Sequence, residues 1–176
     1  REIKIIDINN DGLKDIVCFP AAHNSRVSWI NPALGTNWDA TEHQIVLINQ
    51  GNKKFKLAQD IYNSQEGYFH SGEVADINGD GLLDIYLTSF KGYNSLFINK
   101  GNLTFEKAPL SAGVTDSAGS CFGSTMVDID GDGDLDIYVT KYNFDTNKLF
   151  VTSFNKSHAI FKDIFVKKQM KINILK

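Results

Sequence analysis

One nine-residue pattern occurs three times along this 176-residue chain and constrains its fold more than any other feature. Residues 7–15, 76–84 and 128–136 all read D-x-[DN]-x-D-G-x-x-D, and an isoleucine follows each copy. The three copies hold more than half of the 21 acidic residues, although the formal net charge is only -3. Carboxylates placed this closely repel one another unless a cation lies among them. The pattern therefore predicts a repeated cation-binding loop.

The spacing of the oxygen-bearing residues favours calcium, which binds six to eight oxygens from carboxylates, amides, backbone carbonyls and water. Positions 1, 3, 5 and 9 carry Asp or Asn, position 7 offers its backbone carbonyl, and the glycine at position 6 permits a sharp turn. About three Ca2+ ions are expected, and the third loop, with one more carboxylate ligand, is expected to bind most tightly. The predicted metal ligands are Asp7, Asn9, Asp11, Leu13 and Asp15 in the first loop, Asp76, Asn78, Asp80, Leu82 and Asp84 in the second, and Asp128, Asp130, Asp132, Asp134 and Asp136 in the third.

Other chemistries fit the sequence less well. An EF-hand needs a glutamate at loop position 12, but Cys18, Leu87 and Val139 stand there. The four histidines have no metal-ligand spacing, and the sequence contains no nucleophile elbow or phosphate-binding loop. We therefore expect no catalytic residues and no enzymatic activity. Three alternatives stay open: a polar surface turn that binds no ion, Mg2+ in place of Ca2+, and a pair of carboxylates acting as acid and base.

Similar phrases surround the three loops and indicate an internal repeat. Each loop lies between a short apolar run and an alternating run typical of a β-strand, and two Gly-Asn turns, within 47–55 and 97–105, predict hairpins. The chain is therefore expected to be all-β, with about three four-stranded antiparallel blades forming one partial β-propeller over residues 1–176. The expected blade-like units are residues 1–62, 68–110 and 119–165, and residues 20–42 form an insertion that is either a decorated surface loop or an extra hairpin.

Composition limits the classes of partner and the cellular compartment that we expect for the chain. The mild charge disfavours nucleic acid, and no apolar run approaches the roughly 20 residues of a membrane helix, so neither a nucleic-acid partner nor membrane insertion is expected. Cys18 and Cys121 lie in apolar runs and are expected to be buried free thiols rather than a bridge. Asn102 and Asn155 begin N-x-[ST] triplets, which are compatible with glycosylation and secretion.

The three loops, Phe122-Gly123 ahead of the third, and the Asn-x-Gly-Asn-x-x-Phe phrases at 49–55 and 99–105 make the chain similar to the FG-GAP/VCBS repeat family. Members of that family include the integrin α-subunit propeller, and residues 112–140 resemble its cartilage-acidic-protein (ASPIC) branch. The resemblance implies a seven- or eight-bladed propeller, of which this chain would supply a segment. It also implies an extracellular or secreted protein, cell surface included, that acts in adhesion, matrix contact or ligand display.

The resulting functional hypothesis is a calcium-stabilised module that binds a protein or glycan ligand. Its remaining propeller blades would come from the rest of the chain or from another chain. One alternative is an architectural subunit of a large extracellular assembly, for which an apolar interface around Trp29 and Trp38 would argue. The other is a fragment of a propeller-based enzyme such as a polysaccharide lyase, because a fold does not fix a function.

Overall fold

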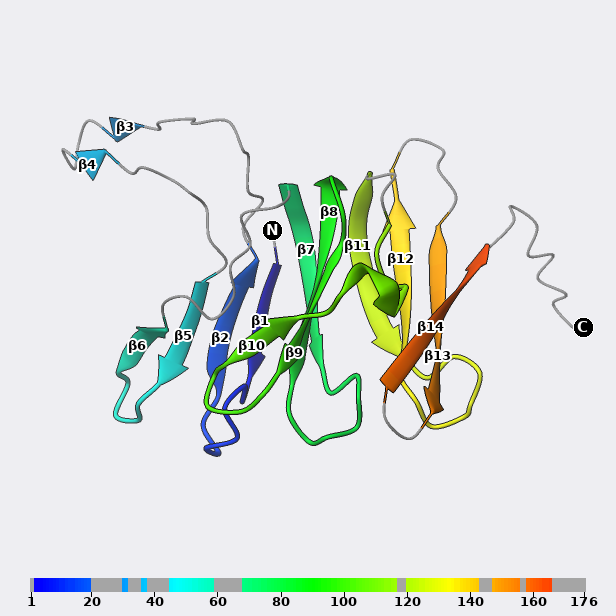
Figure 1. Ribbon diagram of the computed structural model, residues 1–176. Helices are drawn as coiled ribbons and strands as arrows, with labels where there is room; N and C mark the ends of the chain where they lie inside the picture. The colour runs from blue at the N-terminus through cyan, green and yellow to red at the C-terminus, as the bar shows by residue number, and fades with distance from the viewer. Residues whose placement is uncertain are drawn as a thin grey trace, which may run out of the picture.

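The protein is built almost entirely from antiparallel β-sheet (Figure 1). The computed structural model describes residues 2–19, 30–31, 36–37, 45–58, 68–116, 120–142, 147–155 and 158–165. Within these residues the strands form three four-stranded sheets and one two-stranded ladder, and a single short 3-10 helix spans Leu110–Ala112. The prediction of an all-β chain with three four-stranded antiparallel blades is confirmed. Among the described residues, no helix is long and apolar enough to cross a membrane.

Each blade is a meander in which consecutive strands pair antiparallel. Blade 1 contains β1 (Glu2–Ile6), β2 (Asp15–Phe19), β5 (Ile45–Asn49) and β6 (Phe55–Ala58). Blade 2 contains β7 (Tyr68–Ala75), β8 (Asp84–Lys91), β9 (Ser95–Asn99) and β10 (Phe105–Lys107). Blade 3 contains β11 (Cys121–Val127), β12 (Asp136–Lys141), β13 (Lys148–Asn155) and β14 (His158–Phe165). The assignment of residues 1–176 to one domain stays a prediction.

The Gly-Asn phrases form the expected hairpins between the third and fourth strands of blades 1 and 2. In blade 1 the Lys54 N–H donates to the carbonyl of Gly51 at 3.0 Å, and Thr104 donates to Gly101 at the same distance in blade 2. Three consecutive residues of each turn have positive φ, with Gly51 at 73° and Asn52 at 51° in the first. Glycine and asparagine adopt this conformation more readily than other residues, which explains their place in the phrase.

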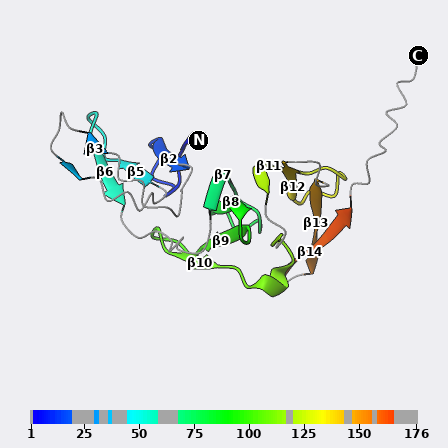
Figure 2. The same cartoon turned by 90° about the horizontal axis from the view of Figure 1, so that it is seen from above.

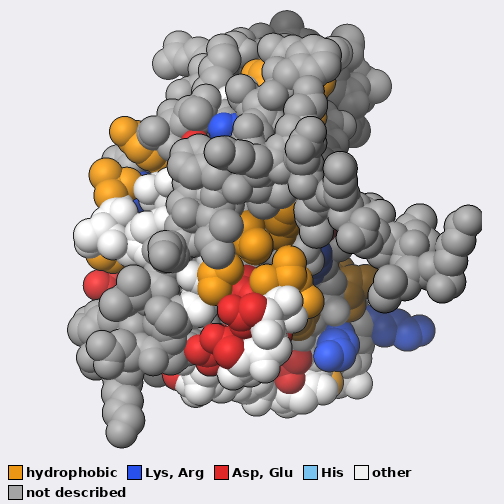
Figure 3. Space-filling model, turned by 90° about the vertical axis from the view of Figure 1, so that its right-hand side faces the viewer, with side chains coloured by type: hydrophobic (Ala, Val, Ile, Leu, Met, Phe, Trp, Pro, Cys, Tyr) orange, Lys and Arg blue, Asp and Glu red, His pale blue; other side chains and the backbone are white. Residues whose placement is uncertain are grey.

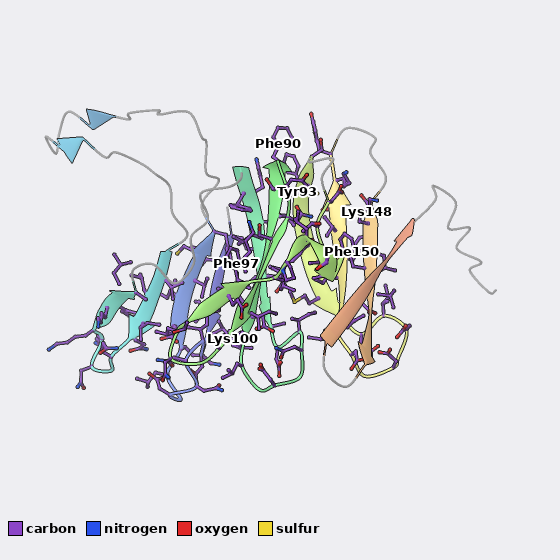
Figure 4. The ribbon with its side chains drawn as sticks, viewed as in Figure 1. Phe90, Tyr93, Phe97, Lys100, Lys148 and Phe150 are labelled. Atoms are coloured by element: carbon purple, nitrogen blue, oxygen red, sulfur yellow. The ribbon has the colours of Figure 1, made fainter. Side chains whose placement is uncertain are left out.

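The hydrophobic core lies in the two seams between the blades, which stand side by side in chain order (Figure 2). Side chains alternate across each strand, so every blade has a backward face toward the preceding blade and a forward face toward the following one. In blade 2, Ile85 and Leu87 pack backward against Val17 and Phe19, while Tyr86 packs forward into the seam with blade 3. The third strands contribute Phe97 and Phe150 to these two seams (Figure 4).

A glycine allows the first seam to close near its innermost strands. The Phe19 ring lies directly over Gly72 of β7, where a Cβ atom would fall 2.5 Å from Cδ1 of that ring. No side chain fits at this position without a shift of the ring.

The structure describes only fragments of the insertion at 20–42, and it modifies the expectation for the cysteines. Within the insertion at 20–42, β3 (Ile30–Asn31) and β4 (Thr36–Asn37) form a two-stranded antiparallel ladder, as an extra hairpin would. Trp29 and Trp38 lie outside the described residues, as does the segment 166–176. Both cysteines are free thiols, but only Cys121 is buried, since Cys18 is partly exposed on the backward face of blade 1. The expectation of two buried thiols is therefore half right.

Candidate metal centre

The three acidic loops occupy equivalent places, each joining the first two strands of its blade at the same end of the molecule (Figure 1). The strands pair up to the last residue before the loop, with Ile6 opposite Asp15, for example. Each loop therefore begins and ends on a fixed strand pair. This placement positions all the candidate ligands from a rigid base.

The aspartate at position 1 shapes each loop by accepting hydrogen bonds from its backbone. The Oδ1 atom of Asp7 accepts from the N–H of Asp11 at 3.1 Å, and its Oδ2 atom accepts from Gly12 at 2.8 Å. In the second loop, Asp76 accepts from the equivalent residues at 3.0 and 2.8 Å. The glycine at position 6 has a φ of 87° in the first loop, in the left-handed region that the turn requires.

The first two loops are alike in a further detail, which the residue at position 3 determines. The Asn9 side-chain amide donates to Oδ2 of Asp11 at 2.9 Å, and Asn78 donates to Asp80 at the same distance. An amide can make this bond because it carries two donors, whereas an ionised carboxylate carries none. The asparagines therefore hold the position-5 carboxylates by direct hydrogen bonds.

The third loop has Asp130 at this position and is arranged differently. The Oδ1 atom of Asp128 accepts from Gly131 at 2.7 Å, and Oδ2 accepts from Gly133 at 3.0 Å. One carboxylate oxygen from each of Asp128, Asp130 and Asp136 lies within 4.8 Å of the other two. Two oxygens that each stand at 2.3–2.6 Å from one Ca2+ ion can be no more than about 5 Å apart. The three carboxylates are therefore close enough together to share a single ion, and they are the one such group among the described residues.

The aspartate at position 9 is buried in every loop and is tied to the blade by both of its oxygens. In the second loop, Oδ2 of Asp84 accepts from the N–H of Ile77 at 3.1 Å, and Oδ1 accepts from Asn99 on the third strand at 2.8 Å. The same pair of bonds occurs at Asp15, from Ile8 and Asn49, and at Asp136, from Ile129 and Thr152. A carboxylate offers about four lone-pair sites, so these two bonds still leave room for a metal ion. The position-9 aspartate thus links the loop to the third strand by hydrogen bonds.

Side chains on the third strand make further hydrogen bonds to the end of each loop, and the predicted metal ligands do not include these residues. The Asn49 side chain donates to the carbonyl of Lys14 at 3.0 Å and accepts from the N–H of Gly51 at 2.9 Å. Asn99 makes the equivalent two bonds in blade 2, and in blade 3 the Thr152 hydroxyl donates to Leu135 at 2.7 Å. The sequence signal for Asn49 and Asn99 was the repeated Asn-x-Gly-Asn phrase, which blade 3 lacks at Thr152.

The electrostatics of the loops favour a cation. Burial raises the pKa of Asp84 to about 6, against the lowering effect of its two backbone hydrogen bonds, and the charges of Asp80 and Asp76 raise it further. Desolvation, together with the neighbouring carboxylates, also raises the pKa of Asp130. A cation would offset this repulsion among like charges. Acidic side chains gather on the blade 3 side of the molecule (Figure 3).

The donor set is suited to calcium because every candidate ligand atom is an oxygen. Loop position 5 is exposed in each loop, so its carboxylate can reach an ion from the solvent side. The geometry brings together Asp128, Asp130 and Asp136, while the ligand roles of Asp132 and of the position-7 carbonyls stay predictions. In the first two loops the complete five-residue ligand sets likewise stay predictions.

A second surface feature lies at the opposite end of the blades (Figure 4). Four rings from blades 2 and 3 cluster there: His70 stands 4.5 Å from Phe122 between ring centroids, Phe90 meets Phe122 edge-on at 5.6 Å, and Tyr142 lies 5.2 Å from Phe122. Phe122 and Tyr142 are 41% and 57% exposed. The sequence did not reveal this cluster, because its members are separated by up to 72 positions along the chain and meet only through the packing of blade on blade.

Comparison with known proteins assigns the repeat. A family model described as an FG-GAP-like repeat matches residues 7–87 and 76–139. The two matches together span all three acidic loops and more than half of the chain, and they concern the repeat rather than a narrower branch. The comparison with curated proteins found no match.

Proposed function

The chain belongs to the FG-GAP-like repeat family, and we propose that it is a calcium-binding β-propeller module that binds a protein or glycan partner outside the cell. The observation that carries the calcium assignment is the convergence of Asp128, Asp130 and Asp136 within 4.8 Å. The other two loops resemble each other and share the sequence pattern of the third, so they are assigned the same ion, with weaker affinity because an asparagine replaces one carboxylate.

The proposed role of the ion is structural. Each loop is fixed at both ends by paired strands, and its position-9 aspartate is bonded to the third strand. Calcium switches of the EF-hand type work by moving helices, and no helix flanks these loops in the described residues. An ion bound here would link the exposed position-5 carboxylate to the buried position-9 carboxylate and so hold the loop against its blade.

The extracellular, partner-binding part of the proposal rests on two arguments. Calcium sites of extracellular modules have Kd values of about 10⁻⁴–10⁻³ M, so even modest affinity at these loops would suffice outside the cell. The exposed rings of Phe122 and Tyr142 offer a surface of the kind that is enriched in protein interfaces. Adhesion or matrix contact is therefore the proposed activity, and the sequons at Asn102 and Asn155 are the proposed glycosylation sites.

The test is a thermal melt of the chain with calcium and with a chelator. An ion that binds only the folded chain stabilises it by about 2.7 kcal/mol when its free concentration is 100 times its Kd. We therefore expect a higher Tm in calcium than in chelator. Asp130→Ala should reduce this gain, because it removes one of the three converging carboxylates. Asp134→Ala is the matched control, because it removes the same charge from a position where only the backbone carbonyl is a proposed ligand.

The result decides between clear alternatives. Equal melting curves with calcium and with chelator would refute the proposal, as would equal losses of calcium response in the two variants. Replacing calcium with magnesium in the same melts tests the choice of ion. A fragment of a propeller-based enzyme stays the alternative reading, and turnover of an acidic glycan by the chain would establish it.

An architectural role in an assembly is the second candidate, and one observation favours it. The backward face of blade 1 leaves Ile3 and Ile5 of its edge strand β1 exposed at 64% and 69%. Exposed apolar sheet faces mark sites where another protein surface packs.

A further inference from the structure

The first two acidic loops are joined by a hydrogen bond across the seam between their blades. The side-chain amide of Asn10, at position 4 of the first loop, donates to the carbonyl oxygen of Gly81, at position 6 of the second loop, at 3.0 Å. The two residues are 71 positions apart in the sequence, so they meet only because blades 1 and 2 stand side by side (Figure 1). Asn10 is not among the predicted metal ligands.

Loop position 4 is an unfavourable place for a side chain. The φ angle there is positive in all three loops, at 60° for Asn10, 71° for Gly79 and 81° for Gly131. Glycine adopts this conformation without steric cost, and asparagine is one of the few other residues that tolerate it. The first loop therefore carries a side chain where the other two have glycine, and that side chain reaches the neighbouring loop. Because Gly79 has no side chain, the second loop cannot make the same bond to the third.

The bond from Asn10 ends on a peptide group that orients a candidate ligand of the second loop. The carbonyl of Gly81 and the N–H of Leu82 belong to this one peptide group, and the N–H donates to Oδ1 of Asp80 at 2.9 Å. A planar peptide group turns as a unit, so a rotation that breaks one of these bonds disturbs the other. Hydrogen bonds in such a chain also polarise and strengthen one another. Asn10 therefore helps to hold the Asp80 carboxylate from the neighbouring blade.

Within its own loop, Asn10 lies between two candidate ligands, Asn9 and Asp11. An ion that bound both of these neighbours would fix the backbone from which the Asn10 side chain projects. We propose that Asn10 is a positioning residue for the second loop, through which an ion in the first loop tightens calcium binding in the second, while the third loop binds independently.

The coupling is positive because the first ion orders the shared hydrogen bond, and the second ion does not meet that entropic cost again. Linkage makes the effect reciprocal, so an ion in the second loop tightens binding in the first by the same factor. This inference rests on the proposed calcium function, and the experiment below separates the failure of one from the failure of the other.

The first measurement is made in chelator and follows the hydrogen exchange of the Leu82 N–H by NMR. Asn10→Gly removes the cross-blade bond but keeps a residue that favours positive φ, so the backbone of the first loop is retained. We expect Leu82 to exchange about 2- to 5-fold faster in this variant, the lower part of the range for one hydrogen bond, because Asn10 is exposed.

Two controls accompany the exchange measurement. The N–H of Asp134 donates to Asp132 in the third loop at 3.0 Å, as Leu82 does to Asp80 in the second, and its exchange rate should not change. Asn52→Gly makes the same substitution at another exposed asparagine with positive φ, 51°, in the hairpin between β5 and β6. This variant should leave the exchange of Leu82 unchanged.

The second measurement is a calcium titration that follows the amide signals of Gly81 and Gly133. Each of these glycines donates to the position-1 aspartate of its own loop, so its signal reports on that loop. Asn10→Gly should weaken calcium binding at the second loop by about 2- to 5-fold and leave the third unchanged. Asp11→Ala removes a candidate ligand of the first loop. It should weaken the second loop by a similar factor in the unmodified chain and have no further effect in the Asn10→Gly background.

An unchanged exchange rate of Leu82 in Asn10→Gly would overturn the proposal. Equal losses of affinity at Gly81 and Gly133 would also overturn it, because a general loss of stability affects all loops alike. The coupling is refuted if Asp11→Ala weakens the second loop equally in both backgrounds. If neither glycine signal of the unmodified chain responds to calcium, the proposed function fails and the coupling fails with it, whereas the exchange in chelator still decides whether Asn10 positions Asp80.

Discussion

Replacing the buried aspartate of the second loop separates its role in the fold from its role as a metal ligand. In Asp84→Ala, the backbone N–H groups of Ile77 and Asn99 lose the carboxylate oxygens that they reach at 3.1 and 2.8 Å. Asp84 is fully buried, so water does not replace these bonds without opening the blade. The variant should therefore be destabilised even when no calcium is present.

The magnitude follows from the number of orphaned groups. Each buried polar group left without a partner costs about 1–3 kcal/mol, so two N–H groups cost about 2–6 kcal/mol. Asp84→Asn should cost roughly half as much, because the amide keeps one acceptor oxygen and turns a donor toward the other N–H. Such losses are large against the about 5–15 kcal/mol that stabilise a typical domain.

The matched comparison is Asp80→Ala in the same loop. Asp80 is exposed, and its oxygens accept only from Leu82 at 2.9 Å and from the Asn78 side chain at 2.9 Å. Its loss should cost about 1 kcal/mol or less in chelator, because water can satisfy both donors. Urea unfolding of both variants, in chelator and in calcium, gives the free energies of unfolding.

The reasoning fails if the two variants lose equal stability in chelator, because Asp84 would then act only through the ion. It also fails if Asp84→Asn costs as much as Asp84→Ala, because the retained oxygen would then carry no hydrogen bond. If Asp84→Ala does not fold, the comparison of Asp84→Asn with Asp80→Asn decides the same question.

Three further outcomes follow from the packing. Gly72→Ala should cost about 1–3 kcal/mol in urea unfolding, because the new methyl group displaces the Phe19 ring. Lys141→Met should cost about 3–5 kcal/mol in the same assay, because it removes the positive charge that lies 2.8 Å from the almost fully buried Asp116 carboxylate. Burial raises the pKa of the Cys121 thiol to about 11, so alkylation of the folded chain, followed by mass spectrometry, should be slow at pH 8 and accelerate as the pH approaches 11.

Each of these outcomes has a control within the chain. Combining Gly72→Ala with Phe19→Leu should recover part of the lost stability, since the smaller leucine side chain leaves room for the new methyl group. Lys100→Met should cost only about 0–1 kcal/mol, because its 3.4 Å pair with Glu106 is exposed to solvent. Cys121 should react rapidly at pH 8 in urea, and equal rates in the folded and unfolded chain would contradict its burial.

The strands and loops could be predicted from sequence because their signals are local. Runs of β-branched and aromatic residues such as 84–88 and 136–140 indicate strands, and Gly-Asn at 51–52 and 101–102 indicates the hairpins between the third and fourth strands of blades 1 and 2. The sequence did not predict in the same way which neighbouring blade each face of a sheet packs against. The direction in which Tyr86 packs depends on which blade stands beside it, and the sequence of one blade does not contain that information.

The same distinction explains what was missed. The ion pair of Lys141 and Asp116 joins the end of β12 to the segment that precedes β11, and neither residue carries a sequence signal for the other. The aromatic cluster around Phe122 likewise exists only because two blades pack together. Both features are products of non-local pairing, whereas the acidic loops are encoded within nine consecutive residues.

The loops themselves show why one sequence pattern can contain two kinds of aspartate. The position-9 carboxylate is buried and bonded to two backbone N–H groups, so it would be needed in a blade that bound no ion. The position-5 carboxylate is exposed and contributes little that water could not supply, so its presence is best explained by a ligand role. In the first two loops the backbone hydrogen bonds already set the turn, as the bonds to Asp7 and Asp76 show. A cation that enters such a loop therefore meets a site whose shape is already set, and its affinity should follow the number of carboxylates, which is greatest in the third loop.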